Sequence, residues 1–541
     1  MKKSLLIIII MSLSILLSTS SFSFQDYFSA LSSPDERLFD YAYQQQHTRA
    51  IRQKRSRQPH DSAAWLMYTR TLAQTDPTEA LALAEYYQHK PDSLSELANV
   101  DAIRQASKWY QHALALVISQ YWLQRHLPQQ QYGAFKQRLY LRAASFYLSQ
   151  NQSTSAFELL LEIADVNQSA LLMAFDLAMG LGRADELSQY QHLLELSDKG
   201  KAHHALLERY QVFNLWYQTL PEQVISSSKL ARANRVLCSN SIQFLSATLA
   251  GLQHAEQLIE QFQSHPLAEQ VCFETPRYLP PKYFDCQTKQ GSAINCNLLA
   301  LSEITPNIES RYLAFVHSDG GANVHYGSLH LALEDNTQVF AHELSHLLGF
   351  GDEYQLRAGH KLCRPEHTQQ SQVYNLVTWP VDELVVSSRA SEQTSANFSI
   401  AERRQQRIGI LAKLPWGKLI DDNTPIWRKI GHRWYLGTPD THRGKVGLFR
   451  AESCDANPDV QAFKPIHDFN QLRFFELDFP QTYLKIKALQ PSKYLMPSFH
   501  YNLALESFWQ NDIEQAKDWL RRAAQLELDD KRKAKVLAGD Y

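Results

Sequence analysis

The stretch FAHELSHLLGFGDEY, residues 340–354, holds the most informative pattern in the chain. A helix that starts just before it can be capped by Asn336 or Thr337. Its apolar residues recur at the spacing of one helical face and are Phe340, Leu344, Leu347 and Leu348. His342 and His346 are four residues apart, which is about 40° around the helix axis. The pattern therefore predicts an amphipathic helix that presents two imidazoles on one side.

Two imidazoles on one side of a helix can bind a single metal ion. Zinc accepts nitrogen ligands in a tetrahedral shell that leaves room for water. Glu343 is next to His342 in the sequence, so its carboxylate can reach over the open coordination position and take a proton from the activated water. We therefore predict one Zn²⁺ per chain, with His342 and His346 as ligands and Glu343 as general base. This is the combination that hydrolysis of a peptide bond requires.

The third ligand should come from the turn that follows the helix. Gly349 stands three residues after His346, where the helix must end and the chain must turn. Asp352 follows three residues later and can come back over the metal, so we expect its carboxylate to be the third ligand. The competing ligands are Glu353, His360 and His367. Of these, Glu353 is expected to form a supporting hydrogen bond or salt bridge instead.

The spacing HExxHxxGxxD of residues 342–352 resembles that of the metzincin zinc peptidases, in which a histidine usually replaces the aspartate. A zinc helix followed by Asp-Glu-Tyr, as at 352–354, is similar to the bacterial IgA-peptidase family. LPWGKLIDDNTPI (414–426) resembles the Trp-x-x-Leu-Ile segment of that family. VGLFRAESCDANPDVQAFKPI (446–466) resembles its Gly-Leu-Tyr-Arg…Cys-x-Met…Phe segment. The resemblance extends over about 311–470.

This resemblance implies a metzincin-like peptidase fold whose site consists of the ligands His342, His346 and Asp352 and the base Glu343. One departure concerns the floor beneath the zinc. The family has a methionine after the cysteine, whereas this chain has Ala456 after Cys454, so the floor is built differently or is looser. The oxyanion also needs a donor besides zinc, and the candidates are Tyr354, His360, His367 and Tyr435.

The whole chain has the composition of a soluble globular protein. Its 541 residues are 44% hydrophobic and 20% charged, and this length suggests about two to four domains. A formal net charge of −2 gives no support for nucleic acid or an anionic membrane surface as a partner. Two lysines precede an apolar run at 5–17, and small residues follow, which is the layout of a secretory signal peptide at 1–23. We expect an exported protein, periplasmic or secreted, with a membrane contact only if this segment is retained.

The cysteines are concentrated in the second half of the chain. They are Cys238, Cys272, Cys286, Cys296, Cys363 and Cys454. An even number in an oxidising compartment indicates disulfides, although six cysteines allow fifteen pairings. We expect two or three disulfides that staple this half. The alternative, a structural zinc site, lacks the CxxC pair that would support it.

Residues 24–255 are rich in Ala, Leu, Gln and Tyr and predict an α-helical, repeat-like domain. YLRAASFYLSQNQSTSAFELLLEIA (140–164) and HYNLALESFWQNDIEQAKDWLRRAA (500–524) share Ala, Gln-Asn, Ala and Leu at identical spacing, with Gln-Asn where a turn should fall. Both resemble the tetratricopeptide repeat, as does 64–88 more weakly, so a helical hairpin is expected at 493–541. A generic helical bundle is the alternative. In either case these helices are expected to bind a protein partner.

Residues 265–485 contain more Pro, Gly, Cys and aromatic residues and are expected to form the zinc peptidase domain. RYLAFVH (311–317) predicts a buried strand, and the alternation in GSLHLAL (327–333) predicts a half-buried edge strand. The predicted fold class is therefore multidomain. It combines an α-helical, tetratricopeptide-like N-terminal region, an α/β metzincin-like domain and a C-terminal helical hairpin.

The leading hypothesis is an exported zinc-dependent endopeptidase that acts on a protein or peptide substrate through metal-activated water. One alternative is a non-catalytic helical-repeat scaffold with a degenerate peptidase-like domain, and another is a zinc amidase that acts on cell-wall peptides. Glu343 favours an enzyme, because a retired site has no reason to keep its base, whereas Ala456 favours the scaffold. The residues specify neither immunoglobulin nor any other sequence to be cut.

Overall fold

The computed structural model describes residues 151–214, 216–218, 238–289, 292–386, 400–431 and 433–540, and several positions between 137 and 149. The expected signal peptide at 1–23 and the weaker repeat at 64–88 lie outside the described residues. Contacts divide the chain into two units, with the boundary between Ala174 and Phe175. In the described part, no helix combines the length and apolar character needed to cross a membrane.

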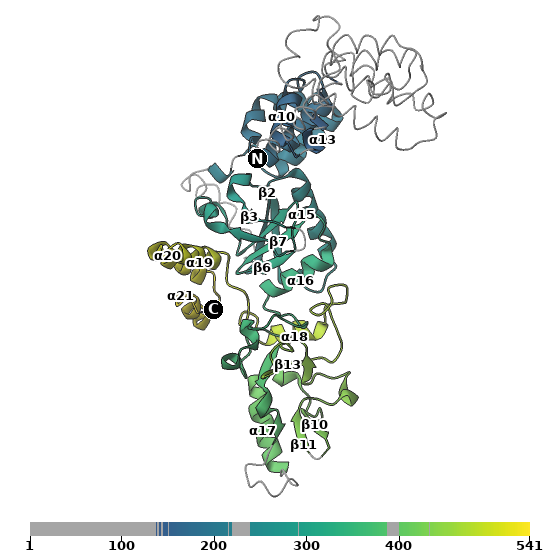
Figure 1. Ribbon diagram of the computed structural model, residues 1–541, viewed down its shortest axis with the longest axis vertical. Helices are drawn as coiled ribbons and strands as arrows, with labels where there is room; N and C mark the ends of the chain where they lie inside the picture. Colours follow the sequence, from purple (N-terminus) through teal and green to yellow (C-terminus); the bar gives the residue numbers. More distant parts are fainter. Residues whose placement is uncertain are drawn as a thin grey trace, which may run out of the picture. The chain divides into compact units, whose positions relative to one another are not determined.

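The larger unit is built on a five-stranded sheet in the order β2-β1-β5-β7-β6 (Figure 1). The strands are β1 (Ser241–Ser246), β2 (Cys272–Tyr278), β5 (Tyr312–His317), β6 (Asn323–His325) and β7 (Ser328–Ala332). The first four in this order are parallel, and β6 runs antiparallel to β7 at the edge. Helix α15 (Leu249–Phe262) connects β1 to β2, and helix α16 (Thr337–Leu347) follows β7. The chain is thus a mixed α/β structure.

The sheet corrects two expectations about the strand at 327–333. All five residues of β7 are buried, including Ser328 and His330, although the alternation predicted one solvated face. The reason is that β7 lies between β5 and β6, helix α16 packs against it, and Cys296 contacts His330. The edge strand is therefore β6, which hydrogen-bonds to β7 alone.

The sheet also corrects the expected domain boundaries. Strand β1 pairs with both β2 and β5, so the α/β fold includes Ser241 and does not start at 265. The helical region expected over 24–255 ends earlier, because β1 is a strand of this sheet and α15 connects it to β2. The strand SIQFLS is short and is soon followed by a helix. Its pairing with remote strands produces no pattern in the local sequence, so the sequence around it predicts a helix.

The remaining described helices and strands come before, between and after the strands of this sheet in the sequence. Before it come α10 (Ser153–Leu161), α11 (Gln168–Leu181), α12 (Gln191–Leu194) and α13 (Asp198–Arg209). Three small sheets are formed by β3 (Asp285–Gln287) with β4 (Asn295–Asn297), by β8 (Val377–Pro380), β12 (Phe449–Ala451) and β13 (Val460–Lys464), and by β9 (Val385–Val386), β10 (Trp427–Ile430) and β11 (Arg433–Leu436). Further helices are α17 (Ile400–Lys413) and α18 (Gln481–Leu489).

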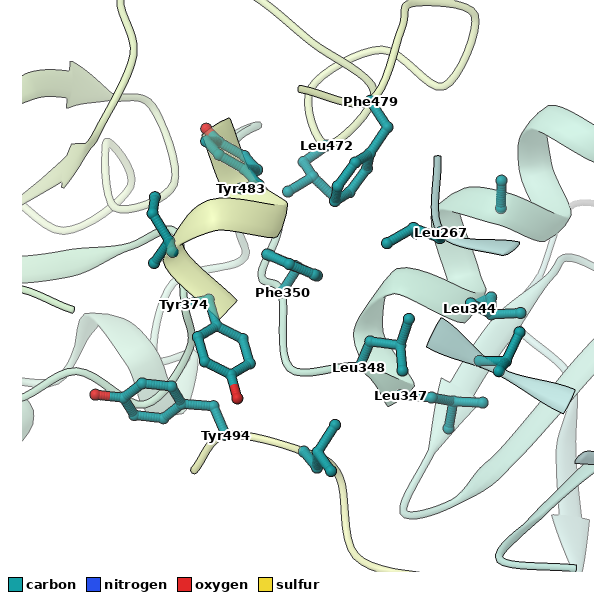
Figure 2. Packing of buried hydrophobic residues seen from close by; sticks show 14 of the residues in the cluster. Leu267, Leu344, Leu347, Leu348, Phe350, Tyr374, Leu472, Phe479, Tyr483 and Tyr494 are labelled. Carbon is teal, nitrogen blue, oxygen red and sulfur yellow. The ribbon is translucent and has the colours of Figure 1, made fainter. Parts of the chain in front are cut away.

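The core joins α16 to the segments that surround it. Phe340 of α16 packs against Phe262 of α15, with ring centroids 5.1 Å apart. Just beyond the helix, Phe350 lies 5.4 Å from Tyr374 and 6.0 Å from Tyr483 of α18 (Figure 2). Burial of such large aromatic side chains contributes several kcal/mol in aggregate. The chain on both sides of the histidines is therefore fixed by packing.

All six cysteines form disulfides, which confirms that expectation. The pairs are Cys238–Cys272, Cys286–Cys296 and Cys363–Cys454. The last pair joins positions 91 residues apart and ties the segment after the histidine helix to the loop before β13. A cross-link of this length removes much conformational freedom from the unfolded chain.

The C-terminal residues form the expected hairpin, from α19 (His500–Trp509) and α20 (Ile513–Gln525), followed by α21 (Asp530–Leu537). Asn511 lies in its turn with φ 64°, and the Asp512 amide donates to the Ser507 carbonyl at 2.9 Å. Asn151, at the matching position of 140–164, has φ 57°. The two sequence copies therefore share one turn geometry, as the Gln-Asn pair predicted. Membership of the tetratricopeptide class stays a prediction.

The hairpin does not stand apart as its own unit, which corrects the expected separation of 493–541. The Arg311 guanidinium, just before β5, contacts the Glu527 carboxylate at 2.7 Å. Arg532 contacts the other oxygen of Glu527, also at 2.7 Å. All three charged side chains are almost fully buried, so the C-terminal helices are attached to the sheet by an ion triad.

We predict that Glu527→Gln lowers the free energy of unfolding by about 3–5 kcal/mol, because it leaves two buried guanidinium groups without a counter-charge. Asp518→Asn is the matched control, since the Arg521–Asp518 pair is exposed and such pairs contribute about 0–1 kcal/mol. Urea unfolding followed by circular dichroism measures both. Equal midpoints for the two variants would contradict the structural role of the triad.

Candidate metal centre

The helix that carries the histidines is fixed at both ends. The Asn336 side chain accepts hydrogen bonds from the amides of residues 338 and 339 at 3.0 and 3.1 Å, so Asn336 is the cap. At the other end Gly349 has φ 92°, and the Phe350 amide donates to the Ser345 carbonyl at 3.1 Å. A Cβ at Gly349 would lie 2.3 Å from the Tyr494 carbonyl oxygen. Only glycine therefore allows the chain to turn here.

The turn brings Asp352 back to the two histidines. Its Oδ1 lies 3.2 Å from Nε2 of His342 and 3.2 Å from Nε2 of His346. The Ser453 hydroxyl donates to the Asp352 carbonyl at 2.6 Å and holds the backbone in this position. The three residues expected as ligands therefore point their donor atoms toward one place.

The hydrogen bonds of the imidazoles assign their tautomers. Nδ1 of His342 lies 2.9 Å from the Gln471 carbonyl oxygen. Nδ1 of His346 lies 3.0 Å from the Phe350 carbonyl oxygen. A carbonyl can only accept, so each Nδ1 carries the proton and donates it. In the neutral rings both Nε2 atoms then carry lone pairs directed at the carboxylate of Asp352, which is how metal-binding histidines are usually oriented.

When both imidazoles are neutral, three lone-pair atoms face one another and repel, and either a proton on an imidazole or a metal cation relieves this repulsion. Asp352 Oδ1 is buried and has no hydrogen-bond partner in the described structure. Ligand atoms at about 2.0–2.1 Å from a tetrahedral zinc ion are about 3.3–3.4 Å apart, close to the 3.2 Å observed for both pairs. The donor set of two imidazoles and one carboxylate is also one that zinc accepts. These residues therefore fit a zinc ion.

The electrostatics of the site favour positive charge. Burial opposes ionisation of Asp352, but the neighbouring His346 and His342 hold its pKa well below the ordinary value. Burial likewise opposes charge on His346, yet attraction to Asp352 raises its pKa to about 10. Burial raises the pKa of Glu343, and the two histidines partly offset this effect. A metal cation between these side chains would be attracted by the same carboxylates.

Glu353 does not compete for this position. Its carboxylate accepts hydrogen bonds from Lys464 Nζ at 2.9 Å, from Asn470 at 2.8 Å and from Asn375 at 3.1 Å. The Tyr483 hydroxyl donates to it as well. The expectation that Glu353 forms a supporting salt bridge is therefore confirmed, and its buried network fixes the residue beside Asp352.

A cavity of about 570 Å³ opens next to the histidines. It is lined by Ala322, Asp335, Val339, His342, Glu343, Tyr354, Gln355, Arg473 and Phe475. Of the candidate oxyanion donors, Tyr354 lines this cavity, and its ring stacks on that of His342 with centroids 6.3 Å apart. His360, His367 and Tyr435 are not among the lining residues, and His360 accepts a hydrogen bond from the nearby backbone.

Sequence patterns did not reveal Arg473 and Phe475 as residues of the site. Arg473 follows Gln471, the residue whose carbonyl orients His342, by two positions. Its Nε donates to Glu452 at 2.8 Å, and its guanidinium lies 4.2 Å from the ring centroid of Phe474. Both lining residues come from a segment more than 100 residues beyond the helix, so no local spacing could have indicated them.

The loop that carries Ala456 contacts the site through Ser453, which accepts a hydrogen bond from the Leu356 amide and donates one to the Asp352 carbonyl. Ala456 itself is half-buried. The position where the IgA-peptidase family has methionine thus belongs to a loop that holds Asp352 in place. That loop is stapled by the Cys363–Cys454 disulfide.

Comparison with known proteins identifies no relative. No family model, curated protein or solved structure matches this chain. The resemblance to the IgA-peptidase family therefore rests on the residues of the chain, and any function has to be argued from the geometry of the metal centre and its cavity.

We predict that Asp352→Ala weakens zinc binding by about 1,000-fold, because it removes the carboxylate oxygen that lies 3.2 Å from both Nε2 atoms. His360→Ala, the matched control, should bind zinc as the parent does, since its side chain is turned to its own backbone. Competitive titration with a fluorescent zinc chelator measures both constants. Near-parental affinity in Asp352→Ala would move the third ligand elsewhere.

Proposed function

We propose that this chain is an exported, zinc-dependent endopeptidase. The observation that carries the proposal is the convergence of His342, His346 and Asp352 beside the cavity that Glu343 lines. A structural metal site would be closed by four protein ligands, whereas three ligands next to an open cavity leave a position for water. That arrangement favours hydrolysis over a structural role.

The proposed chemistry divides the work among a few side chains. A zinc ion bound here would polarise water and the scissile carbonyl. Glu343 accepts the proton of the attacking water and later delivers it to the leaving amine. Tyr354, whose ring is stacked on His342, donates a hydrogen bond to the developing oxyanion. The carbonyls of Gln471 and Phe350 keep the imidazoles oriented throughout.

An extended polypeptide is the substrate that the cavity and the sheet edge suit best. Ala322, which lines the cavity, directly precedes the edge strand β6. A free sheet edge can pair with an extended peptide by backbone hydrogen bonds, so the chain to be cut could lie along β6. Such pairing reads the backbone rather than one sequence, which is consistent with an endopeptidase.

The remaining features support export and partner binding. Three disulfides are typical of proteins from oxidising compartments, so we assign the chain to the periplasm or the exterior, with cleavage of the signal peptide after about residue 23. The helical, repeat-like region expected over 24–255 and the hairpin α19–α20 are proposed to recruit a protein substrate or partner, in the manner of tetratricopeptide repeats. A non-catalytic scaffold would not need a base in the cavity.

We predict that Glu343→Gln keeps one zinc per chain but loses at least about 100-fold in kcat/KM, because it removes the base and spares the ligands. The control is Glu334→Gln, which changes an exposed acid in the loop between β7 and α16, and this variant should cut as fast as the parent. Cleavage of a mixed peptide library followed by mass spectrometry reports the rate, and chelators should abolish it. If Glu343→Gln is as active as the parent, the proposed mechanism is wrong.

We further predict that Tyr354→Phe lowers kcat by about 100-fold with little change in KM, since the hydroxyl acts on the oxyanion and not on the bound peptide. Tyr435→Phe serves as the comparison, because Tyr435 lies in β11 and does not line the cavity. Steady-state kinetics on one library peptide measures both. Equal kcat values for the two variants would remove Tyr354 from the mechanism.

A further inference from the structure

A second cluster of metal-binding side chains lies around the β3–β4 hairpin. Cys286 and Cys296 face each other across this hairpin and form a disulfide. Sulfur atoms of both and a ring nitrogen of His317 lie within 4.8 Å of one another. His330 adds a fourth donor, because its Nδ1 lies 3.5 Å from Cys296 Sγ and 3.3 Å from His317 Nε2. Two sulfurs and two imidazoles are thus gathered in one place.

The two imidazoles are held in position by neighbouring aromatic rings. His330 stacks on Phe315 with centroids 5.1 Å apart and planes at 11°. His317 meets the ring of Phe284 edge-on at 5.8 Å. Burial lowers the pKa of His317 to about 4 and lowers that of His330 as well.

The cysteines would stay near the histidines without the sulfur–sulfur bond. Besides the disulfide, a backbone ladder joins the two strands of the hairpin and pairs residue 285 with 297 and residue 287 with 295. The amide of Gly321 donates to the Ser292 carbonyl at 2.7 Å, and the amide of Ile294 donates to the Gly321 carbonyl at 3.2 Å. These bonds join the hairpin to the loop that follows His317. Opening the disulfide therefore leaves a prearranged set of four donors.

We propose that reduction of the Cys286–Cys296 disulfide creates a second metal site, in which the two thiolates, His317 and His330 bind Zn²⁺ or another thiophilic cation. In this reduction an external dithiol donates two electrons and two protons. The Cys286–Cys296 bond breaks to give two thiols, and the external dithiol becomes a disulfide. Metal binding then releases the two thiol protons to solvent. Exchange with another disulfide reverses the reaction: that disulfide takes up the two electrons and two protons from solvent and becomes a dithiol, while the Cys286–Cys296 bond re-forms and the ion is released.

This site differs in chemistry from the centre at His342. Zinc binds thiolate and imidazole together in tetrahedral sites, with sulfur at about 2.3 Å. The centre on α16 offers only nitrogen and oxygen. In the described part of the chain, neither of the other two disulfides belongs to such a group of potential ligands. Sulfur coordination would therefore report the second site alone, whether or not the proposed peptidase activity exists.

The test uses the full mature chain, loaded with zinc, before and after reduction by a water-soluble phosphine and anaerobic desalting. Each form is titrated with Co²⁺, whose near-ultraviolet thiolate-to-cobalt charge-transfer band requires sulfur ligands. We expect the band only after reduction, at one Co²⁺ per chain. It should vanish in the double variant Cys286→Ser with Cys296→Ser. It should persist in the control with Cys363→Ser and Cys454→Ser.

His317→Ala adds an independent arm, in which reduced protein should bind Co²⁺ at least ten-fold more weakly than the parent. Circular dichroism shows that each variant is folded before it is titrated. A band that survives loss of Cys286 and Cys296 would overturn the proposal, as would a reduced parent without the band. Unchanged Co²⁺ affinity in folded His317→Ala would also overturn the assignment of the ligands.

Discussion

Two imidazole nitrogens and one carboxylate oxygen face one another in the interior of this protein. Oδ1 of Asp352 lies 3.2 Å from Nε2 of His342 and 3.2 Å from Nε2 of His346. With both imidazoles neutral, such an arrangement is unfavourable without a cation, so the surrounding structure must hold the three side chains together. Gly349 makes the turn, the Phe350 side chain anchors it in the core, and the Ser453 hydroxyl holds the Asp352 backbone. Packing elsewhere in the core offsets the unfavourable free energy of bringing three acceptors together, which is typical of a functional site.

The support for this centre comes from distant parts of the chain. The carbonyl of Gln471 fixes the tautomer of His342, and residues of β13 and α18 contribute to the network around Glu353. The Tyr494 carbonyl lies where only a glycine at 349 can pass. The α/β sheet, the loop after β13 and the segment before the C-terminal hairpin therefore act together. A hydrolytic site needs this rigidity, because ligand and base positions must be kept to within about 0.5 Å.

The part of the site that could be predicted from the sequence is the local part. The cap at Asn336 or Thr337, the helix, the turn at Gly349 and the supporting role of Glu353 all follow from spacings within about 17 residues, and the structure decides the cap in favour of Asn336. Long-range features do not follow from such spacings: the pattern predicts helix where β1 lies and a half-buried edge strand where β7 lies, and it does not indicate Arg473. Strand order and cavity lining depend on pairings between remote residues, which leave no period in a single sequence.

The most direct test of the central claim is zinc K-edge X-ray absorption on the oxidised, zinc-loaded protein. The proposed centre predicts one zinc in a shell of nitrogen and oxygen at about 2.0–2.2 Å, with the outer-shell scattering of two imidazoles and no sulfur. A sulfur shell at about 2.3 Å, or zinc without imidazole scattering, would contradict the assignment of His342, His346 and Asp352 as its ligands.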